Sequence, residues 1–268
     1  MKEILIEEGK QLQLGILKNF IRFCEQNQLT YFIAFGTLIG AVRHQGFIPW
    51  DDDIDVQMPR PDYEKLIAIY NQKQAPNEPF YLVSPYEDDA LHSYVKLIDR
   101  RTIKIENGVR YPGDYLGVDI DVFPLDALPD TQEEYDRMFN KMRKIQKKVA
   151  YSVINFEGKT WRDRLLRLYQ RLLGDHRRYV KKMESNLKKR PYSESKFVGT
   201  MISYDDYYND RHEKKDYEST VPLSFEGLTV SAPVGYDRIL RHIYGDYMEL
   251  PPVEKQVTHH GYTVYWKE

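Results

Sequence analysis

The sequence predicts a mixed α/β fold of the α+β class, with a sheet in the N-terminal half and a helical C-terminal half. Short apolar and aromatic runs bounded by turn residues recur over the first 130 residues, as expected for strands. From about residue 131, apolar residues instead recur at spacings of three and four, as on one helix face. The 268 residues, 41% of them hydrophobic, suffice for a substantial core. We therefore divide the chain into a core, 1–130, and a mainly helical part, 131–268, packed on it.

The first elements can be predicted in order along the chain. Residues 5–27 are predicted to form a helix with one apolar face. The run "LTYFIAFG" suits a buried strand that ends at Gly36, and "TLIGAVRHQGF" can begin a helix directly after it. The run "IDVQM" predicts a second strand. "PRPDYEKLIAIYNQ" predicts a helix with Pro61 in its first turn.

Three further strands complete the predicted sheet, at "FYLVS", "YVKLID" and within "GVDIDVFPLDALP". We expect Pro124 to end the last of these, with Asp126 capping or turning the chain beyond it. Helices follow, with one apolar stripe through Met138 and Met142 and another through Leu165 and Leu172.

Charge is unevenly distributed. Residues 137–190 contain 18 Lys or Arg and four Asp or Glu, an excess of 14 positive charges. Because the net charge of the whole chain is −2, the remaining residues together carry a charge of −16. We expect this basic segment to face an anionic surface, either a membrane leaflet or a polyanionic acceptor, and expect no nucleic-acid partner, since the remainder is acidic. With Cys24 as its one cysteine and no apolar signal or spanning run, the chain is predicted to be cytoplasmic.

The stretch "WDDDID" carries the chemistry. Asp53 and Asp55 are one residue apart, so on a strand both side chains point to one face while Ile54 points into the core. Such a pair suits Mg²⁺, which is often held by one or two carboxylates together with substrate phosphates. Asp119 and Asp121, in "GVDIDVF", repeat the spacing. Either can supply a third ligand or accept a proton from an attacking hydroxyl.

Residues upstream of the acids suit phosphate binding. Gly36 permits close approach of the backbone to a phosphate, and Thr37 offers a hydroxyl and an N–H. Arg43 and His44 are donors for phosphate oxygens, although a salt bridge to the acidic loop is the alternative. A strand, a Gly-Thr turn, a D-x-D strand and a distant third Asp together are typical of the nucleotidyltransferase fold.

The run "FGTLIGAVRHQGFIPWDDDIDVQMPRPDYEKL" resembles the signature of the LicD family of phosphocholine transferases, bacterial relatives of the fukutin proteins. The resemblance continues in "KLIDRRT", "IDVFPLDALP", "FEG" and "YGDYMELPP", and so covers nearly the whole chain. It implies transfer of phosphocholine from CDP-choline to a sugar hydroxyl of a cell-surface glycan precursor, typically of teichoic acid, with CMP leaving. The acceptor is expected to be lipid-linked and the enzyme peripheral at the inner membrane face.

The resemblance also implies a set of site residues. It favours Asp121 as the third carboxylate beside Asp53 and Asp55, with Asp119 as the rival. These acids are expected to bind one or two Mg²⁺ ions, which Mn²⁺ can replace, and to catalyse the transfer. The predicted substrate-binding residues are Gly36, Thr37, Arg43, His44, Trp50 and Lys96.

Choline recognition is expected to use aromatic faces and carboxylates, because a quaternary ammonium has no N–H to donate. Trp50 lies beside the acidic loop, and the stretch around Tyr204, Tyr207 and Tyr208 is rich in both residue types. Two alternatives stay open. One is a nucleotidyl- or other phosphodiester transferase using activated ribitol or glycerol phosphate, and the other is a non-catalytic module that binds choline or glycan.

Overall fold

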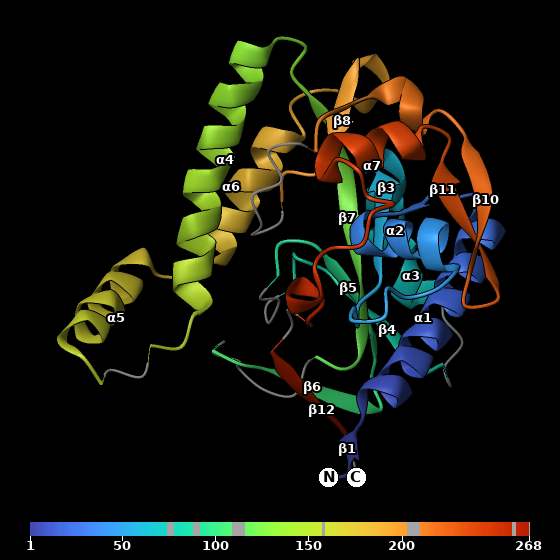
Figure 1. The fold of residues 1–268 in the computed structure, drawn as a ribbon. Helices are drawn as coiled ribbons and strands as arrows, with labels where there is room; N and C mark the ends of the chain where they lie inside the picture. The colour runs from blue at the N-terminus through green and yellow to red at the C-terminus, as the bar shows by residue number, and fades with distance from the viewer. Residues whose placement is uncertain are drawn as a thin grey trace.

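The computed structural model describes residues 1–73, 78–87, 92–108, 116–156, 159–202, 210–258 and 261–267. It confirms the mixed α/β class, with helices on both sides of a central mixed sheet (Figure 1). The strands of this sheet lie in the order β2 (Phe32–Ile33), β3 (Asp55–Pro59), β7 (Asp119–Leu128), β5 (Val95–Asp99) and β4 (Phe80–Val83), and β8 (Phe197–Gly199) pairs with both β7 and β9 (His212–Glu213). Among these pairs only β3 and β7 run parallel.

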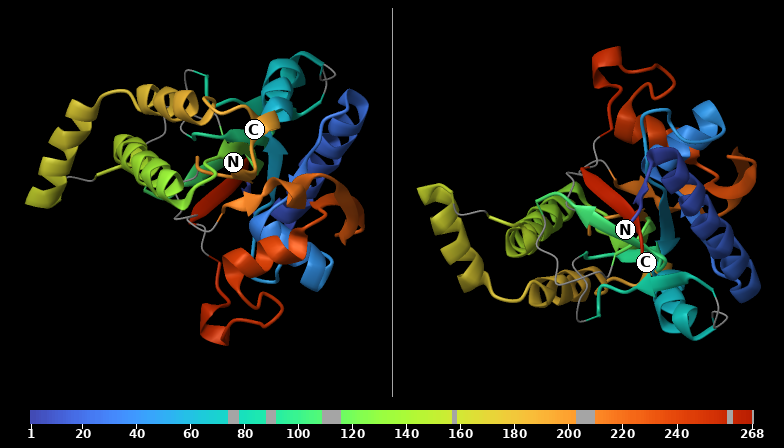
Figure 2. Two further views of the ribbon diagram at one scale, coloured as in Figure 1. Left: turned by 90° about the horizontal axis from the view of Figure 1, so that it is seen from above. Right: turned by 90° about the horizontal axis from the view of Figure 1, so that it is seen from below.

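The helices form two layers around the sheet (Figures 1 and 2). On one side lie α1 (Ile6–Asn27) and α3 (Arg60–Lys73), and on the other lie α4 (Gln132–Val153) and α6 (Arg177–Leu187). Alternation along β7 puts Ile120 and Val122 into the core cluster beneath α1 and α3. Phe123 packs in the cluster on the α4 and α6 side. The remaining helices are α2 (Phe35–His44), α5 (Trp161–Leu173) and α7 (Tyr236–Tyr244), with 3-10 turns at Tyr192–Glu194, Lys214–Tyr217 and Val253–Lys255.

The predicted helical C-terminal half is helical over α4 to α6 and then returns to strands. The antiparallel hairpin β10 (Thr220–Phe225) and β11 (Leu228–Pro233) contributes Phe225 and Val230 to the same core cluster as α1. Near the C-terminus, β12 (Tyr262–Trp266) pairs between β1 (Glu3–Ile4) and β6 (Thr102–Glu106). Before Phe225, burial in β10 alternates only between exposed and half-buried residues, so its strand pattern is weak in the sequence.

The predicted end of a strand at Pro124 is wrong, because β7 continues through it. A proline is tolerated in a strand where no partner needs its N–H. Asp121 donates its N–H to the Ile54 carbonyl of the β3 side, so position 124 faces the other side. On that side of β7, pairing with β5 ends at Val122 and pairing with β8 begins at Asp126. Pro124 therefore occupies the gap between two partner strands.

The strand predicted up to Gly36 is also shorter than expected. It consists of β2 alone, and α2 begins at Phe35. Phe35 has φ 46°, in the left-handed region that residues other than glycine adopt infrequently. This conformation turns the chain abruptly from strand to helix, so Gly36 lies in the first turn of α2. The helices predicted around residues 5–27 and 59–72 are confirmed as α1 and α3.

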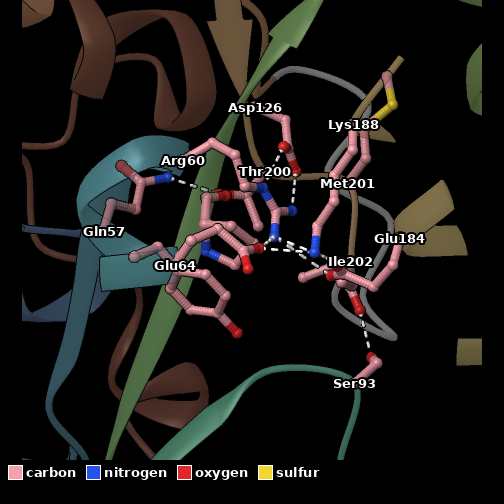
Figure 3. Close-up of polar contacts among 12 residues, drawn as sticks. Gln57, Arg60, Glu64, Ser93, Asp126, Glu184, Lys188, Thr200, Met201 and Ile202 are labelled. Atoms are coloured by element: carbon pink, nitrogen blue, oxygen red, sulfur yellow. Dashed lines mark hydrogen bonds and ion pairs between the residues drawn. The ribbon is translucent and has the colours of Figure 1, made fainter. Parts of the chain in front are cut away.

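A buried ion-pair network joins the helical layer to the sheet (Figure 3). Arg60, at the start of α3, pairs with both oxygens of Asp126 on β7, at 2.6 Å each. Its third nitrogen contacts Glu184 of α6 at 3.0 Å. The expected capping or turning role of Asp126 is therefore wrong, since Asp126 is 1% exposed inside β7. In the described parts of the chain, no helix is both long and apolar enough to cross a bilayer.

Candidate active site

The predicted carboxylates meet where the parallel strands β3 and β7 begin. Asp55 and Asp121 stand directly opposite each other in the register of these two strands. Asp53 precedes β3, in a segment that still accepts an N–H from β7 through the Ile54 carbonyl. The Ile54 side chain is fully buried in the main core, as the alternation predicted. Asp119 and Asp121 share the other face of β7, which lies toward α4 and α6.

The first turn of α2 supports the acidic loop. Thr37 is buried, and its Oγ1 accepts the N–H of Asp55 at 2.8 Å. A Cβ atom at Gly36 would lie 2.6 Å from Oδ2 of Asp51, so the carboxylate of Asp51 packs directly against this glycine. The strained conformation of Phe35 positions both residues. Gly36 and Thr37 thus contact the acidic loop itself.

We predict that Thr37→Val destabilises the protein by about 1–3 kcal/mol, because the buried N–H of Asp55 loses its acceptor while the side-chain shape is kept. The free energy of unfolding from a denaturant titration measures this. The matched control is Thr258→Val, which removes the exposed hydrogen bond from Thr258 to the Trp50 carbonyl. Equal stability of the two variants would contradict the assigned role of Thr37.

Two lysines, the buried Lys96 and the largely buried Lys104, distinguish the rival acids. Lys96 of β5 lies opposite Asp121 in the register and contacts it at 2.5 Å, and it also contacts Asp119 at 2.8 Å. Lys104 of β6 contacts Asp119 at 2.6 Å. Burial disfavours the charged form of Asp119, but Lys104 and Lys96 outweigh it and hold the pKa of Asp119 below its usual value. Asp119 is therefore a permanent anion of a structural ion-pair cluster.

The other acids carry charge that the protein neutralises less well. Burial is the main cause that raises the pKa of Asp121 to about 6, with Lys96 opposing it. Burial also raises the pKa of Asp55 well above its usual value, and the charges of Asp53, Asp121 and Asp51 raise it further. Closely packed carboxylates with raised pKa values are stabilised as anions by a bound cation.

The donor set fits a hard cation that is held mainly through its substrate. Among the described residues, no three carboxylate, imidazole or thiolate side chains converge tightly enough to form a complete metal cage. Mg²⁺ does not need one, because one or two carboxylates and substrate phosphates commonly bind it. Asp55 and Asp53 are the acids best suited to contact such an ion, and Asp121 adjoins them.

Gln13 of α1 braces the two acidic segments. It is buried, and its Nε2 donates to the carbonyls of Asp52 and Asp119, at 3.0 and 3.2 Å. The Asp52 side chain accepts the hydroxyl of Tyr262 at 2.9 Å. The sequence contained no signal for these contacts, because Gln13 and Tyr262 are distant from the acids along the chain.

The other residues predicted to contact substrate make different contacts within the protein. Arg43 donates to the Tyr247 carbonyl at 2.6 Å and to Nε2 of His44 at 2.9 Å, and so holds the segment that follows α7. Trp50 is partly buried against the main core. Lys96 belongs to the acid cluster itself. Their contacts with substrate stay predictions, and the tyrosines 204, 207 and 208 lie outside the described residues.

Tyr244, at the end of α7, is a neighbour of the acids that pattern reasoning did not single out, and it is 42% exposed. Burial raises the pKa of its hydroxyl, followed by the negative charges of Asp55 and Asp210. An aromatic side chain therefore lies close to the acid cluster. The signal was its place at the start of "YGDYMELPP".

Comparison with known proteins identifies the family. The model of the LicD/FKTN/FKRP nucleotidyltransferase domain matches residues 28–124, which contain the predicted metal-binding acids and phosphate contacts but not the tyrosines 204, 207 and 208. The lipopolysaccharide cholinephosphotransferase LicD of Haemophilus influenzae is 31% identical over 272 aligned positions, covering 97% of both chains. The chain belongs to the LicD family. The resemblance drawn from the motifs is thereby confirmed.

Other relatives of this LicD-family chain match over shorter stretches. An uncharacterized protein of Rickettsia typhi is 43% identical over 76 residues, or 27% of this chain. The mannosyltransferase regulator 4 of Saccharomyces cerevisiae is 24% identical over 122 residues, which is 44% of this chain and 10% of the yeast protein. These partial matches add no assignment of substrate.

Proposed function

We propose that this LicD-family protein transfers phosphocholine from CDP-choline to a sugar hydroxyl of a cell-surface glycan precursor and releases CMP. The end-to-end match to a lipopolysaccharide cholinephosphotransferase carries this proposal. The buried carboxylates at the start of β3 and β7 support it with a suitable site. The acceptor is a lipid-linked precursor of teichoic acid or lipopolysaccharide type, reached from the cytoplasmic face of the membrane.

The reaction forms a bond from the acceptor oxygen to the phosphorus that carries choline, and breaks the bond from that phosphorus to CMP. Asp53 and Asp55, with Asp121 beside them, would hold one or two Mg²⁺ ions, or Mn²⁺, against the diphosphate. A metal there neutralises charge that develops during phosphoryl transfer. Asp121 is the acid that we expect to accept the hydroxyl proton, because burial raises its pKa in the metal-free site to about 6, nearer to neutral pH than the pKa of a free carboxyl.

Lys96 keeps Asp121 oriented through their 2.5 Å contact. Tyr244 and Trp50 supply aromatic faces for the quaternary ammonium of choline, which such rings attract electrostatically. Gly36 and Thr37 keep the acidic loop against α2 while the diphosphate binds in front of it. Arg43 and His44 position the chain after α7 and contribute donors at that edge.

The deciding experiment measures CMP release by the full chain from CDP-choline, with and without a glycan acceptor, and detects the new phosphodiester by ³¹P NMR. CDP-ribitol and CDP-glycerol are the comparison donors. We expect release that depends on CDP-choline, acceptor and Mg²⁺ together. Turnover restricted to CDP-ribitol or CDP-glycerol would establish the alternative transferase, and donor binding without turnover would establish a binding module.

We predict that Mg²⁺ affinity rises with pH through about 6, by about tenfold per pH unit for each proton displaced, and levels only when both Asp121 and Asp55 have lost their protons. The reason is that Asp121, with a pKa of about 6, must lose its proton to bind the ion. In the absence of metal, the stability of the protein changes with pH in the opposite direction to the Mg²⁺ affinity. A folded-state pKa above the unfolded value of 3.8 means that stability falls as pH rises between these values. Isothermal titration between about pH 5 and 8 measures the affinity, and a pH-independent value would refute the prediction.

A further inference from the structure

Helix α5 exposes a continuous apolar stripe. Trp161, Leu165, Leu168 and Leu172 are 67%, 57%, 54% and 74% exposed. Their spacings of four, three and four residues place them on one face of the helix. Tyr169, at one edge of the stripe, is partly exposed and contacts the ring of Tyr151 at the end of α4. Single exposed apolar residues are ordinary on protein surfaces, but an aligned row on one helix indicates a binding face.

The stripe is not the face that attaches α5 to the protein. On the opposite side of the helix, Gln170 donates to the carbonyls of Tyr151, Ser152 and Ile154 at the end of α4. Leu173, on this inner side, is buried. In Figures 1 and 2, α5 lies at the outer edge of the molecule, beyond α4 and α6. The inner face is therefore occupied by the chain itself, and the apolar face points outward.

The borders of the stripe are cationic. At 100° per residue, Arg164 and Arg171 lie along one border and Arg162 along the other. The single acid of the helix, Asp163, is engaged in a capping box with Thr160. An apolar stripe bordered by arginines, with a tryptophan at one end, has the composition of helices that lie in the interface of an anionic bilayer. The same charges disfavour pairing of α5 with α5 of a second copy.

The position of α5 in the chain relates its apolar face to the acid cluster. α5 ends at Leu173, and α6 begins at Arg177 only a few residues later. The helix therefore leads directly into α6, on the side of the sheet toward which Asp119 and Asp121 point. A bilayer contacted by α5 would lie beside the site at which a lipid-linked acceptor must arrive.

We propose that α5 is an interfacial membrane-binding helix, whose stripe of Trp161, Leu165, Leu168 and Leu172 enters the headgroup region of an anionic bilayer while its arginines contact lipid phosphates. This inference depends on the geometry of α5 and is independent of the donor and acceptor proposed above. It differs from a general attraction of the basic segment to anions, because it requires the apolar stripe.

The test is co-sedimentation of the full chain with vesicles of phosphatidylcholine containing phosphatidylglycerol, and with vesicles of phosphatidylcholine alone. We expect binding to the anionic vesicles that weakens with salt. The double variant Leu165→Ser, Leu172→Ser should bind at least about tenfold more weakly, because two apolar anchors are lost. Arg164→Glu with Arg171→Glu should remove the preference for phosphatidylglycerol.

The control variant replaces Val253 and Val257 by Ser. These valines lie elsewhere on the surface and are 79% and 49% exposed, so this variant should bind vesicles like the unaltered protein. Circular dichroism and melting temperature verify that each variant is folded. The proposal is overturned if the protein does not bind anionic vesicles or if the two leucine changes leave binding intact. It is also overturned if light scattering shows a dimer that these changes dissociate while vesicle binding is absent.

Discussion

Asp55→Asn should lower kcat by about 10²–10³-fold while leaving the protein as stable as before or more stable. The loss of rate follows from removing a carboxylate that would hold the metal ion against the transferring phosphoryl group. The gain in stability follows because burial and the charges of Asp53, Asp121 and Asp51 already disfavour the Asp55 anion. Asparagine keeps the shape and removes that repulsion. CMP release and the melting temperature, measured on the same samples, test both parts.

The matched control is Asp130→Asn, which changes an acid whose side chain is 50% exposed. It should alter neither rate nor stability. Asp119→Asn and Asp121→Asn separate the rival acids. Asp119→Asn should destabilise the protein, because Lys96 and Lys104 lose a buried counter-charge. Asp121→Asn should mainly reduce kcat. Wild-type turnover in Asp55→Asn would refute the assignment of the acidic pair.

Arg60→Ala should destabilise the protein by about 3–5 kcal/mol, because Asp126 would remain buried without its counter-charge and Glu184 would lose one of its two. Glu184 keeps its 3.0 Å pair with Lys188, so the main loss falls on Asp126. For a chain of this size the change corresponds to a fall in melting temperature of about 10 °C. Arg60 also joins α3, β7 and α6, so its loss should loosen the helical layer. Thermal unfolding monitored by circular dichroism measures the change.

The control for this prediction is Arg22→Ala. Arg22 pairs with Glu78 at a similar distance, 2.9 Å, but its side chain is 57% exposed. An exposed pair contributes about 1 kcal/mol or less, since water solvates both charges after the pair is broken. Similar melting temperatures for the two variants would mean that the Arg60 network is no more than a surface contact.

Much of the fold was predictable because local patterns control it. The apolar periodicity of α1 and α3 requires burial of one helix face, so these helices were found within a few residues. The strand at Pro124 was misjudged because the tolerance for a missing N–H depends on which strands lie opposite. The turn at Phe35 was missed because no residue pattern marks a left-handed phenylalanine.

The candidate site divides in the same way. The one-residue spacing of Asp53 and Asp55, and of Asp119 and Asp121, was enough to predict that carboxylates would meet at one end of a sheet. The sequence could not assign the lysines, because Lys96 and Lys104 reach Asp119 only through the pairing of separate strands. Cross-strand register likewise decided that Asp121 faces Asp55.

The sequence by itself determined the family, the acidic pair and the basic character of residues 137–190, because motif spacing and charge are properties of the chain. Only the tertiary structure decided which of these basic side chains face outward and which bond to other parts of the chain. Arg167 and Arg178, which the charge pattern alone would group with the others, donate to carbonyls of Phe156 and Leu173 within the chain. Arg164 and Arg171 border the outward stripe of α5 instead. The physical reason is that a helix has an inner and an outer face only after its neighbours have packed against it.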